Sequence, residues 1–140
     1  MYTLAIIKPD ALTGAKTGKI LAHLEAAGFV VRAARLAKLT RPEAEAFYEV
    51  HRGRPFYGSL CTFMTSGPCL PMVLERADAV EHLRTVIGAT DPAQAEAGTV
   101  RKLYAESKER NAIHASDSSE NAVKEIAFFF SDSEFKRLWG

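Results

Sequence analysis

Cysteine is scarce in this sequence and its charges nearly cancel, and each of these shortages excludes a class of protein. The two cysteines, Cys61 and Cys69, are too few for a disulfide framework and lack the neighbours of a metal site. We expect reduced thiols of a cytosolic protein, with packing as their role. With 18 basic and 17 acidic residues the net charge is +1, which provides no long-range field for DNA, RNA or anionic lipid.

Long apolar runs and linkers are also missing. No run approaches the roughly 20 residues that span a bilayer. The apolar start of the chain reaches a charge at Lys8, too soon for the core of a signal peptide. No repeat, low-complexity tract or Ser/Pro-rich linker divides the 140 residues. A chain of this length can bury about 70% of its unfolded surface, so we expect one compact cytoplasmic domain over residues 1–140.

The spacing of the apolar residues predicts alternating strands and helices. Strands are expected at residues 2–7, 29–39, 69–75 and 112–114, and helices at 19–27, from 41 through Tyr48, 56–65, 77–87, 100–104 and after Ser119. Pro71 has no N–H for a strand ladder and predicts a bulge or a late start in the third strand. The order favours an α+β fold, a ferredoxin-like (split βαβ) four-stranded antiparallel sheet covered by helices.

Familiar phosphate and metal motifs are absent. The segment from Gly14 to Ile20 looks like a phosphate loop, but a Walker A loop needs four residues between its glycines and a Ser or Thr after the lysine. Three residues separate Gly14 from Gly18, and Ile20 follows Lys19, which favours a surface turn before a helix. No GxGxxG, HExxH, paired CxxC or GxSxG occurs either.

The most informative segment is residues 111–118, where His114 leaves an apolar strand and enters a Ser- and Asp-rich helix start. Backbone N–H groups at such a start can hold an anion. A neutral imidazole, populated near its reference pKa of about 6.5, can act as a nucleophile. A histidine that is merely hydrogen-bonded at a strand end fits these eight residues equally well. His23 and His82 fall within predicted helices and His51 in a polar stretch, so they lack this setting.

Beyond this segment the sequence resembles the nucleoside diphosphate kinase family from end to end. The matching motifs follow the family's order and spacing over nearly all of the chain. They are Ile6-Ile7-Lys8-Pro9-Asp10-Ala11, Arg54-Pro55-Phe56, Thr65-Ser66-Gly67-Pro68, Gly88-Ala89-Thr90-Asp91-Pro92, Gly98-Thr99-Val100-Arg101, Asn111 with His114-Ala115-Ser116-Asp117-Ser118, and Lys124-Glu125-Ile126. The resemblance implies ping-pong transfer of the γ-phosphoryl group of a nucleoside triphosphate, typically ATP, to a nucleoside diphosphate through a phosphohistidine, which maintains nucleoside triphosphate pools.

The resemblance also implies roles for single residues. His114 matches the catalytic nucleophile, and Glu125 matches the partner of its non-attacking nitrogen. Ser116 and Tyr48 match supporting residues beside the histidine. Because phosphoryl transfer depends on positioning and charge stabilisation, cations and hydroxyls are the expected phosphate ligands; the matching residues are Lys8, Arg84, Thr90 and Arg101.

Base, sugar and metal contacts follow from the same resemblance. Phe56 matches the aromatic residue that stacks on the base, in a way that tolerates every base. Asn111 and Lys8 match the contacts to the sugar hydroxyls, of which the 3′-hydroxyl folds back towards the phosphates in this family. Mg²⁺ is expected to arrive bridged by the nucleotide phosphates, because the sequence shows no carboxylate cage of its own.

Assembly and three departures from the family pattern complete the expectations. The family forms homo-oligomers, and the short C-terminus favours a tetramer over a hexamer or dimer. Ala115 stands where the family usually has glycine, Asp91 where it commonly has asparagine, and Pro71 falls in a strand that the fold places centrally. Local geometry is left open at these positions.

Two rival functions remain to be weighed. Ferredoxin-like folds also serve RNA recognition, but such a domain has aromatic and basic residues interleaved on its strands, and Tyr2 to Ile7 lacks that pattern. A catalytically weak family member could act as a binding or regulatory scaffold. The presence of His114, Lys8, Arg84 and Arg101 argues against it.

Overall fold

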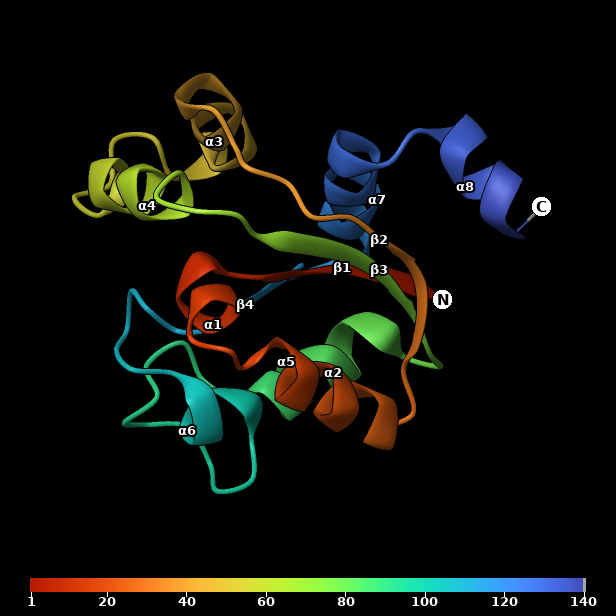
Figure 1. Ribbon diagram of the computed structural model, residues 1–140, viewed down its shortest axis with the longest axis horizontal. Coiled ribbons are helices and arrows are strands. Elements are labelled where there is room, and N and C mark those ends of the chain that lie inside the picture. The colour runs from red at the N-terminus through yellow and green to blue at the C-terminus, as the bar shows by residue number, and fades with distance from the viewer. Residues whose placement is uncertain (140) are drawn as a thin grey trace.

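The computed structural model describes residues 1–139, with side chains as far as Arg137. Four strands form one antiparallel sheet in the order β2-β3-β1-β4, which confirms the predicted α+β architecture (Figure 1). The strands are β1 (Tyr2–Ile7), β2 (Val30–Ala34), β3 (Leu70–Glu75) and β4 (Ile113–Ala115). No helix in this described part of the chain is both long and apolar enough to cross a membrane.

Helices cover both faces of the sheet. One face carries α2 (Thr17–Ala26), α5 (Ala79–Ile87) and α6 (Val100–Tyr104), and the other carries α3 (Arg41–Phe47), α4 (Tyr57–Met64) and α7 (Ser119–Phe129) (Figure 1). Three further helical segments are absent from the sequence prediction: α1 (Pro9–Thr13), the 3₁₀ turn η1 (Glu49–His51) and α8 (Asp132–Trp139). The first two are short, and a helix of one turn leaves no apolar period to read.

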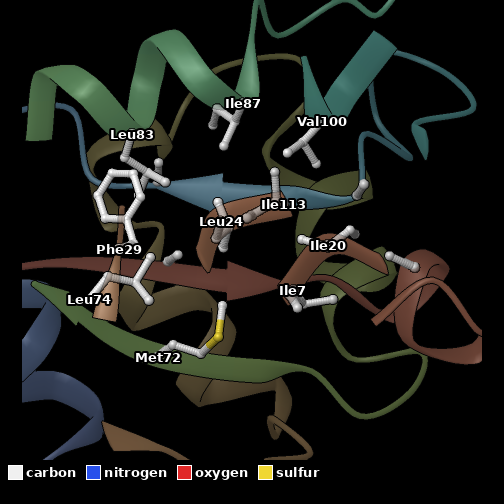
Figure 2. Close-up of a cluster of buried hydrophobic side chains, with 14 of the residues drawn as sticks. Ile7, Ile20, Leu24, Phe29, Met72, Leu74, Leu83, Ile87, Val100 and Ile113 are labelled. Carbon is white, nitrogen blue, oxygen red and sulfur yellow. The ribbon is translucent and has the colours of Figure 1, made fainter. Parts of the chain in front are cut away.

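The core is double because the sheet is buried on both sides. Along β1, Ala5 and Ile7 belong to the cluster under α2 and α5 (Figure 2), and Leu4 and Ile6 to the cluster under α3, α4 and α7. Burial on both faces explains why β1 is a continuous apolar run instead of an alternating one. The cysteines lie in the second cluster with both thiols free and buried, as their scarcity predicted.

The second strand is shorter than predicted. β2 ends at Ala34, and pairing resumes only at the Ala37–Cys69 bridge. Pro71 accounts for the gap: its carbonyl accepts the N–H of Arg35 at 3.2 Å, so its missing N–H is on the same side, facing β2. Of the two effects expected from Pro71, the late start is seen, because β3 begins at Leu70, one residue after the predicted start, whereas the bulge is not in β3. It lies in β2 between Val31 and Ala33, and β3 runs from Leu70 without interruption.

Local signals fixed the helix starts better than the strand ends. Thr40 and Glu43 form the predicted capping box at α3, and the Ser118 hydroxyl accepts the N–H of Asn121 at the start of α7. Residues 14–16 form a turn before α2, in agreement with the rejection of a phosphate loop there.

Candidate active site

A cavity of about 620 Å³ opens at the edge of the sheet where β1 ends and β4 lies beside it. Every predicted site residue except Ser116 lines this cavity. Those residues are Lys8, Tyr48, Phe56, Arg84, Thr90, Arg101, Asn111, His114 and Glu125. They come from segments separated by up to 117 positions (125 − 8), so the fold, and not local sequence, assembles them.

His114 lies in β4, opposite Ile6 of β1, and only 19% of its side chain is exposed. Its Nε2 is 2.7 Å from Glu125 Oε1, and the Ser116 hydroxyl donates to the same oxygen at 2.7 Å. A carboxylate can only accept, so Nε2 carries the proton. No hydrogen-bond partner of Nδ1 occurs among residues 1–139, which leaves that lone pair available.

Burial lowers the pKa of His114 below its ordinary value of 6.5, and the hydrogen bond and negative charge of Glu125 offset part of this shift. The imidazole is therefore neutral at neutral pH. Aromatic edges fix the ring: the centroid of Phe47 lies 5.3 Å away and that of Tyr48 6.1 Å away, both in edge-to-face contact. The histidine is thus a neutral base with one free nitrogen in a rigid setting.

Tyr48 is buried, with 4% of its surface exposed, and its hydroxyl has no partner within the described part of the chain. Burial raises its pKa well above the ordinary value of 10. The phenol therefore keeps its proton at any physiological pH. The hydroxyl oxygen itself has almost no exposed surface, so Tyr48 contributes its ring to the wall of the cavity.

Lys8 and Asn111 form the floor of the cavity, where both are almost fully buried. The Lys8 ammonium donates to Asn111 Oδ1 at 2.8 Å, and Asn111 Nδ2 donates to the carbonyl of Thr90 at 3.2 Å. Desolvation and the charge of Arg101 lower the pKa of Lys8 to about 8, against the opposing effects of Asp10 and Glu109. The lysine remains mainly charged at neutral pH.

Arg101, which is 6% exposed, donates to three backbone carbonyls: Gly88 at 3.0 Å, Ile113 at 2.6 Å and Asn111 at 3.4 Å. A guanidinium has five N–H donors, so two remain for a ligand. Burial and the nearby Arg84 lower its pKa to about 10, which still leaves it charged. Gly88 is needed for this arrangement, because its φ is +89° and a Cβ there would lie 2.6 Å from the Thr99 hydroxyl.

The far end of the cavity is apolar and open. Phe56, 43% exposed, sits just before α4, and Val50 and Leu60 line the wall beside it. His51 was not among the predicted site residues, but it lines the cavity, with its ring centroid 5.2 Å from that of Phe56.

Two further residues missed from the sequence, Lys108 and Glu109, line the cavity, with Glu109 against α4. The Ser59 hydroxyl of α4 lies 2.7 Å from Glu109 Oε2 and 3.1 Å from the carbonyl of Phe56, and its single proton is donated to the closer, charged carboxylate. The loop that precedes β4 is thereby attached to α4. This contact joins residues 50 positions apart, which no local pattern predicts.

The departures at positions 115 and 91 leave the site intact. Ala115 is in β4 and is absent from the residues with positive φ, and its carbonyl accepts a hydrogen bond from Arg84 at 3.2 Å. Glycine's conformational freedom is therefore not needed there. Asp91 accepts the N–H of Ala93 at 2.9 Å in a short side-chain turn, a role open to asparagine as well.

The carboxylates of the cavity do not form a metal cage. Glu125 is engaged with His114 and Ser116, Glu109 with Ser59, and one oxygen of Asp117 with Asn121. Within residues 1–139 no group of three or more His, Cys, Asp or Glu side chains could hold a metal ion. The donor set fits a divalent ion that is carried by a phosphorylated ligand.

Basic side chains and a neutral histidine that share one cavity define the class of protein. Lys8, Arg84 and Arg101 supply positive charge around the free Nδ1 of His114, an arrangement suited to phosphoryl transfer. The chain is therefore a phosphotransferase.

Comparisons with known proteins identify the family. The nucleoside diphosphate kinase family model matches residues 1–135. Nucleoside diphosphate kinases of Chlorobium limicola and Chlorobium chlorochromatii are 55% and 57% identical over 136 and 135 residues, which cover 97% and 96% of each chain. This chain belongs to the nucleoside diphosphate kinase family.

Solved structures agree with that assignment. The Aquifex aeolicus nucleoside diphosphate kinase superposes with a TM-score of 0.93 at 43% identity, over 95% of this chain and 96% of that one. The Halobacterium salinarum enzyme, solved in complex with CDP, gives 0.91 at 35% identity over 96% and 90%. The protein is thus an enzyme that transfers a phosphoryl group from a nucleoside triphosphate to a nucleoside diphosphate. As a nucleotide kinase of this family it works with a divalent metal.

Proposed function

We propose that the reaction passes through a phosphohistidine formed on His114 Nδ1. The observation that carries the proposal is the hydrogen bond of Nε2 to Glu125, which leaves Nδ1 unprotonated and free in the cavity. The Nδ1 lone pair attacks the γ-phosphorus, the bond to the bridging oxygen breaks, and the nucleoside diphosphate leaves. A terminal phosphate oxygen of the second diphosphate then attacks the same phosphorus, and the P–N bond breaks.

Glu125 and Ser116 support this step from the far side of the ring. Positive charge develops on the imidazole when Nδ1 bonds to phosphorus, and the carboxylate that accepts the Nε2 proton at 2.7 Å stabilises that charge. The Ser116 hydroxyl, also 2.7 Å from Glu125 Oε1, fixes the orientation of the carboxylate. Glu125 is therefore a catalytic partner of His114, and Ser116 is a positioning residue.

Nucleotide contacts divide along the cavity. Arg84, Arg101 and the Thr90 hydroxyl bind the phosphates beside His114, and the Tyr48 ring, in edge-to-face contact with His114, supports the same region. Lys8 and Asn111, already hydrogen-bonded to each other at 2.8 Å, bind the sugar hydroxyls, and the Lys8 charge also faces the phosphates. The base stacks on Phe56 at the open end.

Mg²⁺ is the divalent ion that we propose. Such an ion would neutralise part of the charge of the nucleotide phosphates. Asp117 lines the cavity and has one oxygen that is not engaged by Asn121, so it is the side chain best suited to face an ion held by the nucleotide. The protein otherwise contributes cations to this region, which fits an ion that arrives with its ligand.

We further propose one kinase domain over residues 1–140 that works in the cytoplasm as a homo-oligomer, with a tetramer favoured over a hexamer or dimer. Free buried thiols suit a reducing compartment. β2 is an edge strand with Val30 45% exposed, and Val123 on α7 is 70% exposed, features that favour burial between subunits. Sedimentation analysis of the purified protein tests the assembly, and a monomer would contradict it.

The decisive test of the phosphohistidine is labelling with γ-³²P-ATP. We expect label on the wild-type protein that is lost in acid and kept in alkali, as a phosphoramidate requires. His114→Ala should carry none. His23→Ala is the matched control, because His23 is half-buried on α2 and outside the cavity. Label that persists on His114→Ala would assign the intermediate to another residue.

A further inference from the structure

A strained turn separates the sugar-binding residue from the histidine. The N–H of Ile113 donates to the carbonyl of Asn111 at 2.9 Å, and Ala112 between them has a φ of +74°. A three-residue turn of this hand is rare, and an alanine adopts it only when its surroundings hold it there. Two other residues, Ala15 and Asp78, share a positive φ among the described non-glycine residues, but both lie on the surface, whereas Ala112 is fully buried.

Asp10, in α1 directly after β1, holds this turn by a hydrogen bond. Its Oδ2 accepts the N–H of Ala112 at 3.1 Å, across 102 positions of sequence. The N–H of Lys8 donates to the carbonyl of Ala112 at 2.9 Å. Arg101 donates to the carbonyls on either side, those of Asn111 and Ile113. The turn is therefore fixed by the same residues that line the cavity floor, with Asp10 added behind them.

The cost of placing Asp10 there points to a role beyond stability. The residue is 5% exposed, and its second oxygen, Oδ1, is buried with no hydrogen-bond partner in the described chain. A buried carboxylate with one oxygen unsatisfied destabilises the fold. Helix capping does not explain it either, since Lys8 is the N-cap of α1 and receives no side-chain cap. What Oδ2 does is hold Ala112.

We propose that Asp10 is a positioning residue of the kinase reaction: it holds the strained turn at Ala112 and thereby fixes Asn111 and His114 relative to each other. Asp10 does not line the cavity and touches no nucleotide; it acts through the backbone of residues 111–114. The inference rests on the proposed roles of His114 and Asn111. It predicts a loss of phosphorylation rate when Asp10 cannot accept the Ala112 N–H, even with ATP saturating.

The experiment compares single-turnover phosphorylation by γ-³²P-ATP, together with thermal unfolding, for a set of variants. Asp10→Ala removes the acceptor, and Asp10→Leu removes it at nearly constant size, which keeps the test valid if the alanine variant unfolds. Both should slow phosphorylation at least about tenfold, the size expected when a strained backbone is released. Asp10→Asn keeps an acceptor oxygen and should stay within about threefold of wild type.

A second substitution, Ala112→Gly, tests the proposed cause directly, because glycine adopts a positive φ without support from Asp10. Ala112→Gly added to Asp10→Leu should recover most of the lost rate. Ala15→Gly, which relieves a positive φ at the surface, is the matched control and should recover none. A wild-type rate in Asp10→Leu, an Asp10→Asn as slow as Asp10→Leu, or no recovery with Ala112→Gly would each overturn the inference. Failure of the wild-type protein to label at His114 would instead refute the proposed function.

Discussion

The two ends of the cavity are built differently. At the phosphate end Lys8, Arg101 and Asn111 are 7%, 6% and 3% exposed, and hydrogen bonds tie each of them to another part of the site. At the base end Phe56 and Val50 are 43% and 82% exposed. One end is a polar network fixed to the sheet. The other is an open slot between a 3₁₀ turn, a short helix and a loop, where apolar side chains lie beside the polar His51, Lys108 and Glu109.

This difference matches what each part of the substrate demands. Phosphorus, attacking nitrogen and leaving oxygen must be aligned, so small displacements are costly at the phosphate end. Purines and pyrimidines share only a flat apolar face, which an exposed aromatic ring can accept without directional bonds. On the proposed assignment of the two ends, the contacts are fixed where every substrate is the same and non-directional where substrates differ.

The largest expected effect comes from the two arginines, which also separate catalysis from stability. Arg84→Ala and Arg101→Ala should each lower kcat, because loss of one charge-stabilising donor typically costs about 2.7–4 kcal/mol in the transition state. Arg101→Ala alone should also lower the free energy of unfolding, by roughly 1–3 kcal/mol, since it leaves backbone carbonyls without donors. Arg84 is exposed and makes one such bond.

Steady-state kinetics and urea unfolding of both variants make this measurement. Lys102→Ala, an exposed neighbour outside the cavity, serves as the control for both readouts. If both arginine variants kept the wild-type kcat and changed only KM, the arginines would bind ground state and transition state equally and the phosphate end would not be specialised for chemistry.

A smaller effect is expected at the sugar, where the two ends meet. 2′-Deoxynucleotides should remain good substrates. 3′-Deoxynucleotides should phosphorylate His114 more slowly, with a barrier higher by about 1–3 kcal/mol, because one hydrogen-bond donor of Lys8 or Asn111 loses its acceptor. Asn111→Leu should narrow that difference. Pre-steady-state phosphorylation with ATP, dATP and 3′-dATP measures it, and equal rates for the three would remove the sugar role from Lys8 and Asn111.

The sequence predicted the phosphate end better than the base end, for a physical reason. His114, Lys8 and Arg101 lie in short motifs whose residue types suit the chemistry, and the structure brings all three to one cavity. Lys108 and Glu109 have ordinary surface composition. Their position depends on the Ser59–Glu109 contact, which exists only after the loop has packed on α4.

Backbone conformation was the hardest feature to predict. The turn at Ala112 could not be read from the sequence, because alanine has no preference for positive φ and the support comes from Asp10, 102 positions away. The early end of β2 is similar. It depends on whether the hydrogen-bonding side of Pro71, which has no N–H, faces β2 or β1, and the sequence does not show this. Helix starts were predicted well because capping is local: Thr40 and Glu43 are three residues apart.

At the base end we expect an effect that does not depend on the base. Phe56→Ala should weaken ATP, GTP, CTP and UTP by similar factors, on the order of 1–3 kcal/mol. Phe56→Tyr is the control, because it keeps the ring. Binding of each nucleotide to His114→Ala protein, measured by calorimetry, avoids turnover. A loss of affinity for one base alone would show that this end recognises the base by hydrogen bonds. The two ends of the cavity would then not differ in the way proposed.

The smallest expected effect is the pH dependence that the buried Lys8 gives to stability and to phosphorylation rate. Its pKa is lowered from 10.5 to about 8, so the folded state binds the proton less tightly than the unfolded state. The resulting destabilisation is fully present below about pH 8 and disappears as pH rises towards 10.5. Over the same interval the ammonium loses its charge, so phosphorylation should slow while the Lys8 contribution to stability improves.

Lys8→Met isolates the effect, because other titrating groups are common to both proteins. The free energy of unfolding of Lys8→Met minus that of wild type should fall between pH 7 and pH 9.5, because only the wild type gains stability as Lys8 loses its proton. The alkaline fall in phosphorylation rate should be absent from the variant. If this signed difference rose with pH, the pKa of Lys8 would be raised in the folded protein. The neighbouring groups would then stabilise its charge by more than burial destabilises it.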